Sequence, residues 1–419
     1  MSAQNHVLAY SGGLDSTVLL HLAGSAALPG LKAVHVHHGL QAQADAWAAH
    51  CQQQCATLGV PLALLRVSIA SDDPQGPEAA ARAARYAALA QHLSAGAVLL
   101  TAHHQQDQAE TLLLRLLRGT GVEGMAAMRA LTPFAQGQLW RPLLGVPKSA
   151  LKSYADEHGL RWIEDPHNAQ PRFARSWLRA DVMPLLRTRV PQADALFARA
   201  AQHAGEAAIT LAEVAEQDLA TARLPGGALS IRQLQQLRAA RCDASVRHWL
   251  GQCGLPAPTF DMMEKLHSEI FAARPDAEPL LAWPGGEFRR YRDALHASAP
   301  LAAEPGAWCA DWNASGILML PPGCGVLRSH ETAVPRDSIL TVRFAQGGER
   351  IKTRGREHHK TLKLLAQEAG IPPWVRRRMP LLFEGAELLS VAGIWEAAGA
   401  PRLHWHCPEL PGAPAARGG

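Results

Sequence analysis

The sequence of 419 residues lacks several features that would place it in particular protein classes. Its seven cysteines are scattered, so a disulfide framework of the kind found in small secreted domains is not expected. No apolar run approaches membrane-spanning length, and no basic stretch followed by an apolar core opens the chain. We therefore expect a cytoplasmic globular protein with reduced thiols and no membrane partner.

The commonest phosphate-binding loop, Gly-x-x-x-x-Gly-Lys-Ser/Thr, is also missing. The chain has instead Ser11-Gly12-Gly13-Leu14-Asp15-Ser16, between an apolar run that predicts a buried strand and a run that predicts a helix. Free backbone N–H groups and the positive end of the helix dipole would converge there on an anion, and the glycines let the backbone approach it closely. An aspartate beside a phosphate makes sense if a divalent cation bridges the two. The alternative is a plain glycine turn capped by aspartate and serine.

Strands and helices alternate through the first part of the chain. Strands are predicted at 6–10, 33–36, 62–67 and 97–101, and helices at 41–57 and 77–93. This order predicts an α/β fold with a doubly wound parallel sheet, in which ligands bind at the carboxyl ends of the strands. Ser11, His37 and His103-His104 each follow a predicted strand, so we expect them to converge on one crevice.

The helix expected after the fourth strand carries a polar face. His103 and Asp107 lie four residues apart, and Asp107 and Glu110 lie three apart, so they share one side of a helix. Such a face could bind Mg²⁺ or a substrate amine, or it could be a solvated first turn, since acidic residues favour helix N-termini. Next to the phosphate loop it becomes a candidate catalytic site. Zinc is not expected, because no partner cluster stands at ligand spacing.

Arginines later in the same region suggest contacts with a polyanion. Arg115 and Arg118 precede a glycine-rich stretch, and a stripe of arginines at helical spacing follows: Arg172, Arg175 and Arg179. The stripe predicts a phosphate-contacting helix or, equally, a solvated face.

Positive charge is concentrated near the end of the chain. Residues 343–378 hold ten Lys/Arg and three Glu, a net +7, whereas the whole chain carries only +4. This local excess suggests that a polyanion binds at one place, although a merely solvated basic surface is the alternative. The residues of this segment that we expect to contact nucleic acid are Lys352, Arg354, Arg376, Arg377 and Arg378.

Composition and periodicity divide the chain into five parts. They are a catalytic domain at 1–190, an alanine-rich linker helix at 191–224, a mostly helical central domain at 225–300, a linker at 301–339 and a small α+β domain at 340–419. Within the last part we expect a helix at 359–369 and strands at 381–383 and 387–391.

The Ser-Gly-Gly-x-Asp-Ser pattern resembles the PP-loop of the ATP pyrophosphatase superfamily, whose members split ATP between its α and β phosphates and activate a substrate oxygen as an adenylate. Further motifs resemble the bacterial tRNA(Ile)-lysidine synthetases, most specifically over residues 7–180. They are His35-Val36-His37-His38-Gly39-Leu40, Thr101-Ala102-His103-His104 with Asp107-Gln108 and Glu110-Thr111, Arg118-Gly119 with Gly121 and Gly124, Arg141-Pro142-Leu143-Leu144, and Asp165 with Asn168 and Arg179.

This resemblance implies a ligase that forms a C–N bond and uses ATP, Mg²⁺, L-lysine and the isoleucine tRNA whose anticodon is CAU. The C2 oxygen of the wobble cytidine would be adenylated, and the lysine ε-amine would then displace AMP and leave lysidine. Codon and amino-acid specificity would change from methionine to isoleucine. The two C-terminal domains would bind tRNA, and no obligate protein partner is implied.

The resemblance also implies roles for individual residues. Asp15 and Asp107 would hold the metal, Glu110 would orient the lysine amine, and His103 or His104 would accept its proton. The residues implied to bind ATP are Ser11, Gly12, Gly13, Leu14, Asp15, Ser16 and His37, and those implied to bind tRNA in the catalytic domain are Arg82, Arg115, Arg118, Arg172, Arg175 and Arg179.

Some positions depart from the family pattern, and rival functions can be named. Gln105-Gln106 stands where an acidic residue often precedes Asp107, and Ser176 stands where an asparagine is expected. A tRNA thiolase of the same superfamily would need sulfur-handling cysteines, often Cys-x-x-Cys, whereas Cys51 and Cys55 are separated by three residues. A small-molecule amidating ligase would not need the basic segment. A catalytically inactive RNA-binding protein would not need the intact loop.

Overall fold

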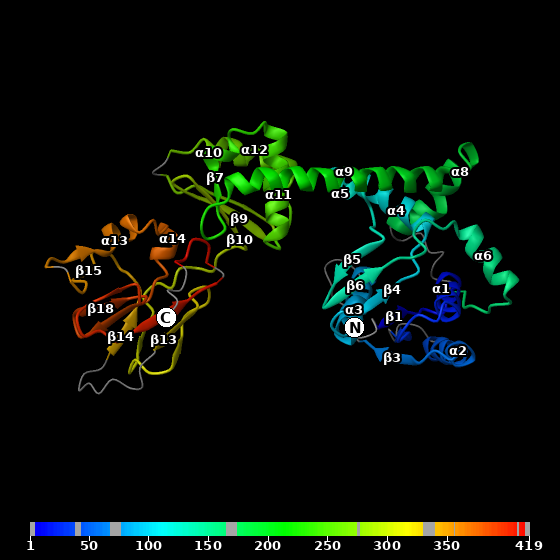
Figure 1. The fold of residues 1–419 in the computed structure, drawn as a ribbon, viewed down its shortest axis with the longest axis horizontal. Helices are drawn as coiled ribbons and strands as arrows, with labels where there is room; N and C mark the ends of the chain where they lie inside the picture. Colours follow the sequence, from blue (N-terminus) through cyan, green and yellow to red (C-terminus); the bar gives the residue numbers. More distant parts are fainter. Residues whose placement is uncertain are drawn as a thin grey trace. The chain divides into compact units, whose positions relative to one another are not determined.

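The chain forms two compact units, Met1–Thr210 and Leu211–Gly419 (Figure 1). The computed structural model describes residues 5–37, 43–67, 77–164, 174–274, 277–329, 340–355, 357–408 and 410–414. Within these ranges no helix is both long enough and apolar enough to cross a membrane.

A six-stranded sheet forms the centre of the first unit, in the order β3-β2-β1-β4-β6-β5. Its strands are β1 (His6–Ala9), β2 (Lys32–His37), β3 (Leu62–Arg66), β4 (Val98–Leu100), β5 (Leu131–Phe134) and β6 (Gly137–Trp140). All neighbouring pairs are parallel except β5 with β6. The chain order reverses between β1 and β4, so the ligand crevice of such a sheet lies at the carboxyl ends of these two strands.

Helices cover both faces of this sheet, as a doubly wound fold requires. Consecutive residues of β1 point to opposite faces. Leu8 packs in a core with α1 (Leu14–Ser25), α2 (Ala44–Thr57) and α6 (Lys148–Glu157), whereas Val7 packs with Leu89 of α3 (Pro77–His92). The α/β fold class predicted from the sequence is thereby confirmed. The antiparallel hairpin of β5 and β6 was not predicted, because four-residue strands carry little periodicity.

The rest of the first unit is helical. Helix α4 (Gln105–Leu116) follows β4 and leads to α5 (Val122–Met125), and α7 (Ala174–Trp177) continues through a π-helix, Leu178–Val182, into α8 (Met183–Arg189) and α9 (Ala193–Ala222). The long helix predicted from Pro191 to about Ala222 is α9. It crosses the boundary between the two units, giving Ala201 to a core with Leu112 of α4 and Leu219 to the core of the second unit.

The second unit begins with a four-stranded antiparallel sheet in the order β7-β10-β9-β8. Trp249, Trp283 and Phe288 meet Leu219 in its core. The strands are β7 (Leu229–Ser230), β8 (Leu280–Trp283), β9 (Gly286–Tyr291) and β10 (Ala294–Ser298), and the helices are α10 (Ile231–Leu234), α11 (Ala239–Gln252), α12 (Phe260–Lys265) and a π-helix, Leu266–Phe271.

Short strands build the remainder of the second unit, in sheets ordered β11-β14-β17-β18-β19 and β12-β13-β20 and a two-stranded sheet of β15 and β16. Their bounds are β11 (Cys309–Asp311), β12 (Ile317–Met319), β13 (Val326–Ser329), β14 (Leu340–Arg343), β15 (Arg350–Ile351), β16 (Lys360–Thr361), β17 (Leu381–Glu384), β18 (Glu387–Val391), β19 (Trp395–Glu396) and β20 (Leu403–His406), with helices α13 (Leu362–Glu368) and α14 (Pro373–Arg376). The helix and both strands predicted in the last part of the chain are present as α13, β17 and β18.

The stretch 301–339, expected to be a linker, differs from that expectation. It contains β11, β12 and β13, and β11 pairs with β14 while β13 pairs with β20. These strands are three or four residues long and lie among prolines and glycines, so they leave no alternation of apolar and polar residues to detect.

Candidate active site

The predicted phosphate loop lies at the carboxyl end of β1 and opens α1. Gly12 has φ +83°, and a Cβ at this position would lie 2.7 Å from Ile163 Cδ1 and 2.9 Å from Cys51 Sγ. Only glycine fits that backbone and that space. Gly13 is the N-cap of α1 and offers no side-chain cap, which is an arrangement that can bind an anion through the first-turn N–H groups. Ser11 Oγ lies 3.0 Å from Ser16 Oγ beside them.

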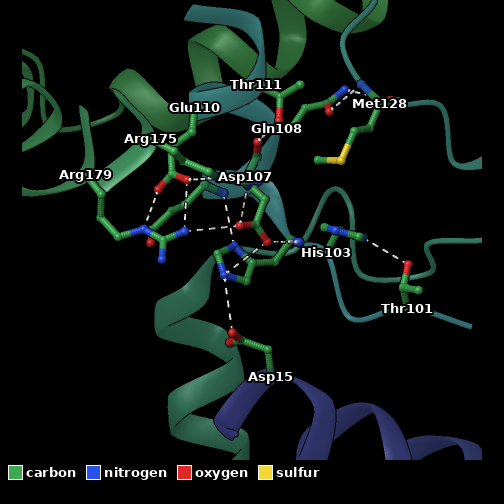
Figure 2. A network of polar contacts seen from close by, with 12 residues as sticks. Asp15, Thr101, His103, Asp107, Gln108, Glu110, Thr111, Met128, Arg175 and Arg179 are labelled. Atoms are coloured by element: carbon green, nitrogen blue, oxygen red, sulfur yellow. Dashed lines mark hydrogen bonds and ion pairs between the residues drawn. The ribbon is translucent and has the colours of Figure 1, made fainter. Parts of the chain in front are cut away.

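His104 links the loop to α4. The His104 Nδ1 accepts a hydrogen bond from the backbone N–H of Gln106 at 3.2 Å. The backbone N–H of His104 donates to Asp107 Oδ2 at 3.0 Å, and the two bonds form a capping box at the start of α4. Because Nδ1 accepts the hydrogen bond from Gln106, a ring proton is assigned to Nε2. That Nε2 lies 3.5 Å from Asp15 Oδ2 and 3.5 Å from Asp107 Oδ2 (Figure 2). The two predicted metal carboxylates therefore flank one imidazole.

Two arginines hold the carboxylates of α4 (Figure 2). Glu110 is 1% exposed, and its oxygens accept from Arg175 Nε at 2.9 Å and from Arg179 Nε at 2.8 Å. Asp107 Oδ1 accepts from Arg175 Nη2 at 2.9 Å. Burial alone would raise the pKa of the Asp107 carboxyl, but the neighbouring His104 and Arg175 side chains hold it below its usual value. Asp107 is therefore ionised at neutral pH.

His103 occupies a different setting from its neighbour. Its Nδ1 lies 2.9 Å from the Thr101 hydroxyl. Burial lowers the pKa of His103 to about 4, against the charge of Asp107, and the positive charges of Arg141 and Arg82 lower it further. The ring is therefore neutral at physiological pH and able to accept a proton.

The donor set around Asp15 fits a divalent cation. Asp15 Oδ1 is buried and has no hydrogen-bond partner among the described residues, so it is available to a cation. Asp107 supplies a second carboxylate on the other side of His104. Hard oxygen donors of this kind suit Mg²⁺.

The other predicted residues of the first unit are more dispersed. Buried His37 ends β2 and lies 3.2 Å from Asp45. Arg115 donates to the Gly124 carbonyl at 2.9 Å, and Arg118 is exposed. Arg82 is exposed on α3, and Arg172 lies outside the described residues.

In the second unit, Arg378 corrects one expectation. It is 4% exposed and donates to the backbone carbonyls of Trp374 and Ala302 at 3.0 and 2.6 Å. A guanidinium buried in this way cannot reach a phosphate, so its predicted contact with RNA does not hold. Half-buried Arg377 is ion-paired with Glu278 and Glu304, half-buried Arg376 lies beside it, and Lys352 and Arg354 are exposed.

Sequence reasoning missed some residues that the fold brings to the site. Thr101, which contacts His103, and Arg141, whose charge acts on it, appeared only inside motifs of the resemblance. Arg175 and Arg179 were predicted to face phosphates and instead bind carboxylates more than sixty residues away. The sequence did carry a signal for Thr101 and Arg141, because they directly follow two strands of the sheet, β4 and β6.

Comparisons with known proteins agree with this geometry. A PP-loop domain model matches residues 1–186, a TilS substrate binding domain model matches 229–296, and a TilS substrate C-terminal domain model matches 340–406. A U34-tRNA thiolase, NcsA from Methanococcus maripaludis, matches in structure with a TM-score of 0.38 and 16% identity over 48% of this chain and 72% of that one, too weakly to bear on function.

Curated relatives match over nearly the whole chain. A tRNA(Ile)-lysidine synthase from Xanthomonas campestris pv. campestris is 44% identical over 95% of this chain and 94% of its own length. One from Alkalilimnicola ehrlichii is 47% identical over 94% of this chain and 91% of its own, and one from Pseudomonas aeruginosa is 44% identical over 96% and 93%. With the phosphate loop and its paired carboxylates in place, the chain belongs to the tRNA(Ile)-lysidine synthase family.

Proposed function

We propose that this chain joins the ε-amine of L-lysine to C2 of the wobble cytidine in tRNA(Ile) with the anticodon CAU, converting ATP to AMP and pyrophosphate. The observation that carries the proposal is the placing of Asp15 and Asp107 on one nitrogen of His104, next to the uncapped N-terminus of α1. Adenylation of an RNA oxygen needs donors and a cation where negative charge develops. The modified tRNA would then decode isoleucine rather than methionine.

In the first step the C2 oxygen attacks the α-phosphorus of ATP, and pyrophosphate leaves. The N–H groups of the loop would stabilise the charge that develops on pyrophosphate, with the hydroxyls of Ser11 and Ser16 as further donors. Asp15 and Asp107 would hold Mg²⁺, which supplies additional charge neutralisation when bound. His37, at the end of the neighbouring strand, would contact the adenine.

In the second step the lysine amine attacks C2, AMP leaves, and a base accepts the proton of the amine. We assign that base to His103, because its only described ring contact is the one from Nδ1 to the Thr101 hydroxyl, whereas both ring nitrogens of His104 are engaged. His104 is assigned to positioning, because its Nδ1 caps α4 and its Nε2 faces two carboxylates. Glu110 would orient the incoming amine by accepting a hydrogen bond from it in place of those from Arg175 and Arg179.

The parts of the chain would divide the work. The catalytic domain is assigned to 1–190 and the linker helix to 191–224. The central domain, 225–300, and the C-terminal domain, 340–419, would bind tRNA, and β11 and β13 belong to the sheets of the latter. Lys352 and Arg354 support this assignment as exposed cations of the last domain.

The test is incorporation of labelled lysine into tRNA. The full chain is incubated with ATP, Mg²⁺, labelled lysine and total tRNA, and the labelled species is digested and identified. We expect label in a single tRNA at the wobble cytidine, with one AMP formed per lysine. Incorporation that does not require ATP, or the absence of label from every tRNA, would contradict the proposal.

A thiolase activity is less well supported by the site. Cys51 and Cys55 both pack in the core beneath α1, and burial raises their thiol pKa values to about 12 and about 11. Thiols in that state are poor nucleophiles and poor metal ligands.

A further inference from the structure

Arg141 reaches the site through the parallel pairing of β4 and β6. Leu100, the last residue of β4, pairs with Trp140, the last residue of β6, and the Thr101 N–H donates to the Trp140 carbonyl at 3.0 Å. Since the two strands run the same way, the residues that follow them leave the sheet at the same edge. Arg141 therefore lies beside the segment that carries His103.

Arg141 has only neutral partners in the part of the chain that the structure describes. Its Nη1 donates to the Arg129 carbonyl at 2.7 Å and lies 3.4 Å from Thr132 Oγ1. Its Nε is buried and has no hydrogen-bond partner there. A buried cationic donor without a partner is costly, and an anion at this point would offset that cost.

Two arginines of α3 add to this positive charge. Arg82 Nη2 lies 3.4 Å from the Tyr86 hydroxyl, and the Cζ atoms of Arg82 and Arg85 lie 4.9 and 5.6 Å from the centre of the Tyr86 ring. Tyr86 is fixed in turn by an edge contact with Phe134 of β5 at 5.8 Å. None of the described carboxylates forms an ion pair with Arg82, Arg85 or Arg141.

The Arg82 guanidinium lies within electrostatic reach of both Arg85 and Arg141. Burial lowers the pKa of Arg141, and the positive charges of Arg82 and Arg115 lower it further, against the effect of Tyr86. The pKa of Arg85 is lowered by burial in the same way, with Arg82 among the causes. An anion between them would relieve this repulsion.

The position of this cluster distinguishes it from the site for ATP. The phosphate loop follows β1, and His37 follows β2, whereas Arg141 follows β6, with β4 between β1 and β6. Two strand spacings separate β1 from β6, about 10 Å. The Arg141 side of the cluster is therefore separate from the place where ATP is expected.

We propose that Arg82, Arg85 and Arg141 form an anion site that holds a backbone phosphate next to the target cytidine, and that Arg141 is a positioning residue that sets this nucleotide against His103. This inference rests on the proposed function. The ligand it names is a phosphodiester of the substrate RNA, recognised through charge and not through base identity.

The first test is Arg141→Gln in the full chain, with tRNA binding measured over a range of salt concentrations. We expect the slope of log affinity against log salt to become shallower by about 0.7–0.9, the effect of one phosphate contact. The matched control is Arg129→Gln, which removes an exposed neighbouring charge but keeps the carbonyl that Arg141 binds. An equal change in the control would mean that general charge, not this site, is responsible.

The second test identifies which phosphate of the RNA Arg141 contacts. A tRNA is made with a neutral methylphosphonate at one linkage on either side of the wobble cytidine. Wild-type affinity should fall about tenfold for one of the two linkages, and Arg141→Gln should show no further loss there. Additive losses at both linkages would overturn the proposal, even if Arg141→Gln were partly unfolded, because the comparison is made within each protein.

The outcomes separate this inference from the function on which it rests. If the wild type forms no lysidine, the proposed function fails. If the wild type forms lysidine and Arg141→Gln does so with unchanged KM for tRNA, only the phosphate site fails. A rise in the KM for ATP with unchanged tRNA binding would show that the anion is a nucleotide phosphate, which also overturns the proposal.

Discussion

Asp15 contributes the carboxylate of the phosphate loop, and its environment explains why a negative charge is tolerated there. One oxygen faces His104 Nε2 at 3.5 Å, and the other is buried without a partner among the described residues. A carboxylate at an anion-binding helix terminus is stable when it shares a cation with the anion. The aspartate and the phosphate groups therefore belong to one site.

We expect Asp15→Asn to slow adenylation by about 10²–10³, because it removes a group that holds charge where charge develops. Pyrophosphate release at saturating Mg²⁺ measures the effect. Asp156→Asn is the control, since Asp156 is 53% exposed and lies on α6, away from the loop. Near-normal turnover of Asp15→Asn would reduce Asp15 to a helix residue without a catalytic task.

Glu110 offers a second prediction. If it orients the lysine amine, Glu110→Gln should raise the KM for lysine much more than the KM for ATP. The substitution also leaves Arg175 and Arg179 without their buried acceptor, so thermal stability must be measured alongside. Equal increases in both KM values would place Glu110 in the ATP–metal site.

The neutral state of His103 sets the pH dependence of the transfer step. Its folded pKa of about 4 lies below the ordinary value of 6.5, so the native protein binds this proton only at acid pH. If His103 is the base, the acid limb of kcat for lysine transfer should lie near pH 4 and not near 6.5. A limb near pH 6.5 that persists in His103→Gln would assign the base to another group, and one that disappears would show that the pKa of His103 is not lowered. Because the unfolded chain binds this proton more readily, His103 contributes to the free energy of unfolding above pH 6.5, and that contribution is lost as the pH falls towards 4.

At the scale of secondary-structure elements, the sequence predicted the parts that depend on local pattern. The loop before α1 and the polar face of α4 follow from glycine, strand and helix signals within a few residues. The pairing of Arg175 and Arg179 with α4 does not, because it joins positions more than sixty residues apart. The same limit applies to Arg378, whose burial depends on Ala302 and Trp374 and not on the charges beside it.

The basic C-terminal elements therefore divide into exposed and buried cations. Replacing exposed Lys352 and Arg354 with alanine should make the salt dependence of tRNA binding shallower by roughly 1.5 units, at about 0.7–0.9 for each phosphate contact. Filter binding over a salt series measures it, and ATP affinity should not change. An unchanged slope would show that neither residue touches RNA.

Arg378→Gln is the contrasting variant for that experiment. It should lower the melting temperature, because two buried carbonyls lose their donors at a cost of about 1–3 kcal/mol. The salt slope should stay at the wild-type value.

At the scale of the whole molecule, one helix contributes to two cores. Helix α9 gives Ala201 to the first unit and Leu219 to the second, and the boundary between the units falls inside it, after Thr210. The two cores are thus joined by a continuous hydrogen-bonded backbone instead of a loop. Unwinding the middle of α9 should therefore be felt in both units.

Thr210→Pro tests this connection. Proline in a helix interior costs about 3 kcal/mol or more, because it removes a backbone hydrogen bond and clashes with the preceding turn. We expect faster hydrogen exchange in peptides that contain Leu112 and in peptides that contain Trp249. Thr210→Ala should leave both unchanged, since alanine favours helix. Faster exchange in one unit only would show that the two cores are independent.

The packing of Cys51 against Gly12 allows the opening rate of the phosphate loop to be measured by chemical labelling. Cys51 Sγ lies 2.9 Å from the place that a Cβ of Gly12 would fill, its side chain is fully buried, and burial raises its thiol pKa to about 12. An alkylating reagent can react with it only after the loop lifts away. Cys253 and Cys309 are exposed and can be blocked beforehand. Because Cys55, Cys242, Cys324 and Cys407 are buried as well, alkylation is followed in the peptide that contains Cys51. Its rate reports how often the loop opens, and a bound nucleotide should lower that rate according to how firmly it holds the loop closed.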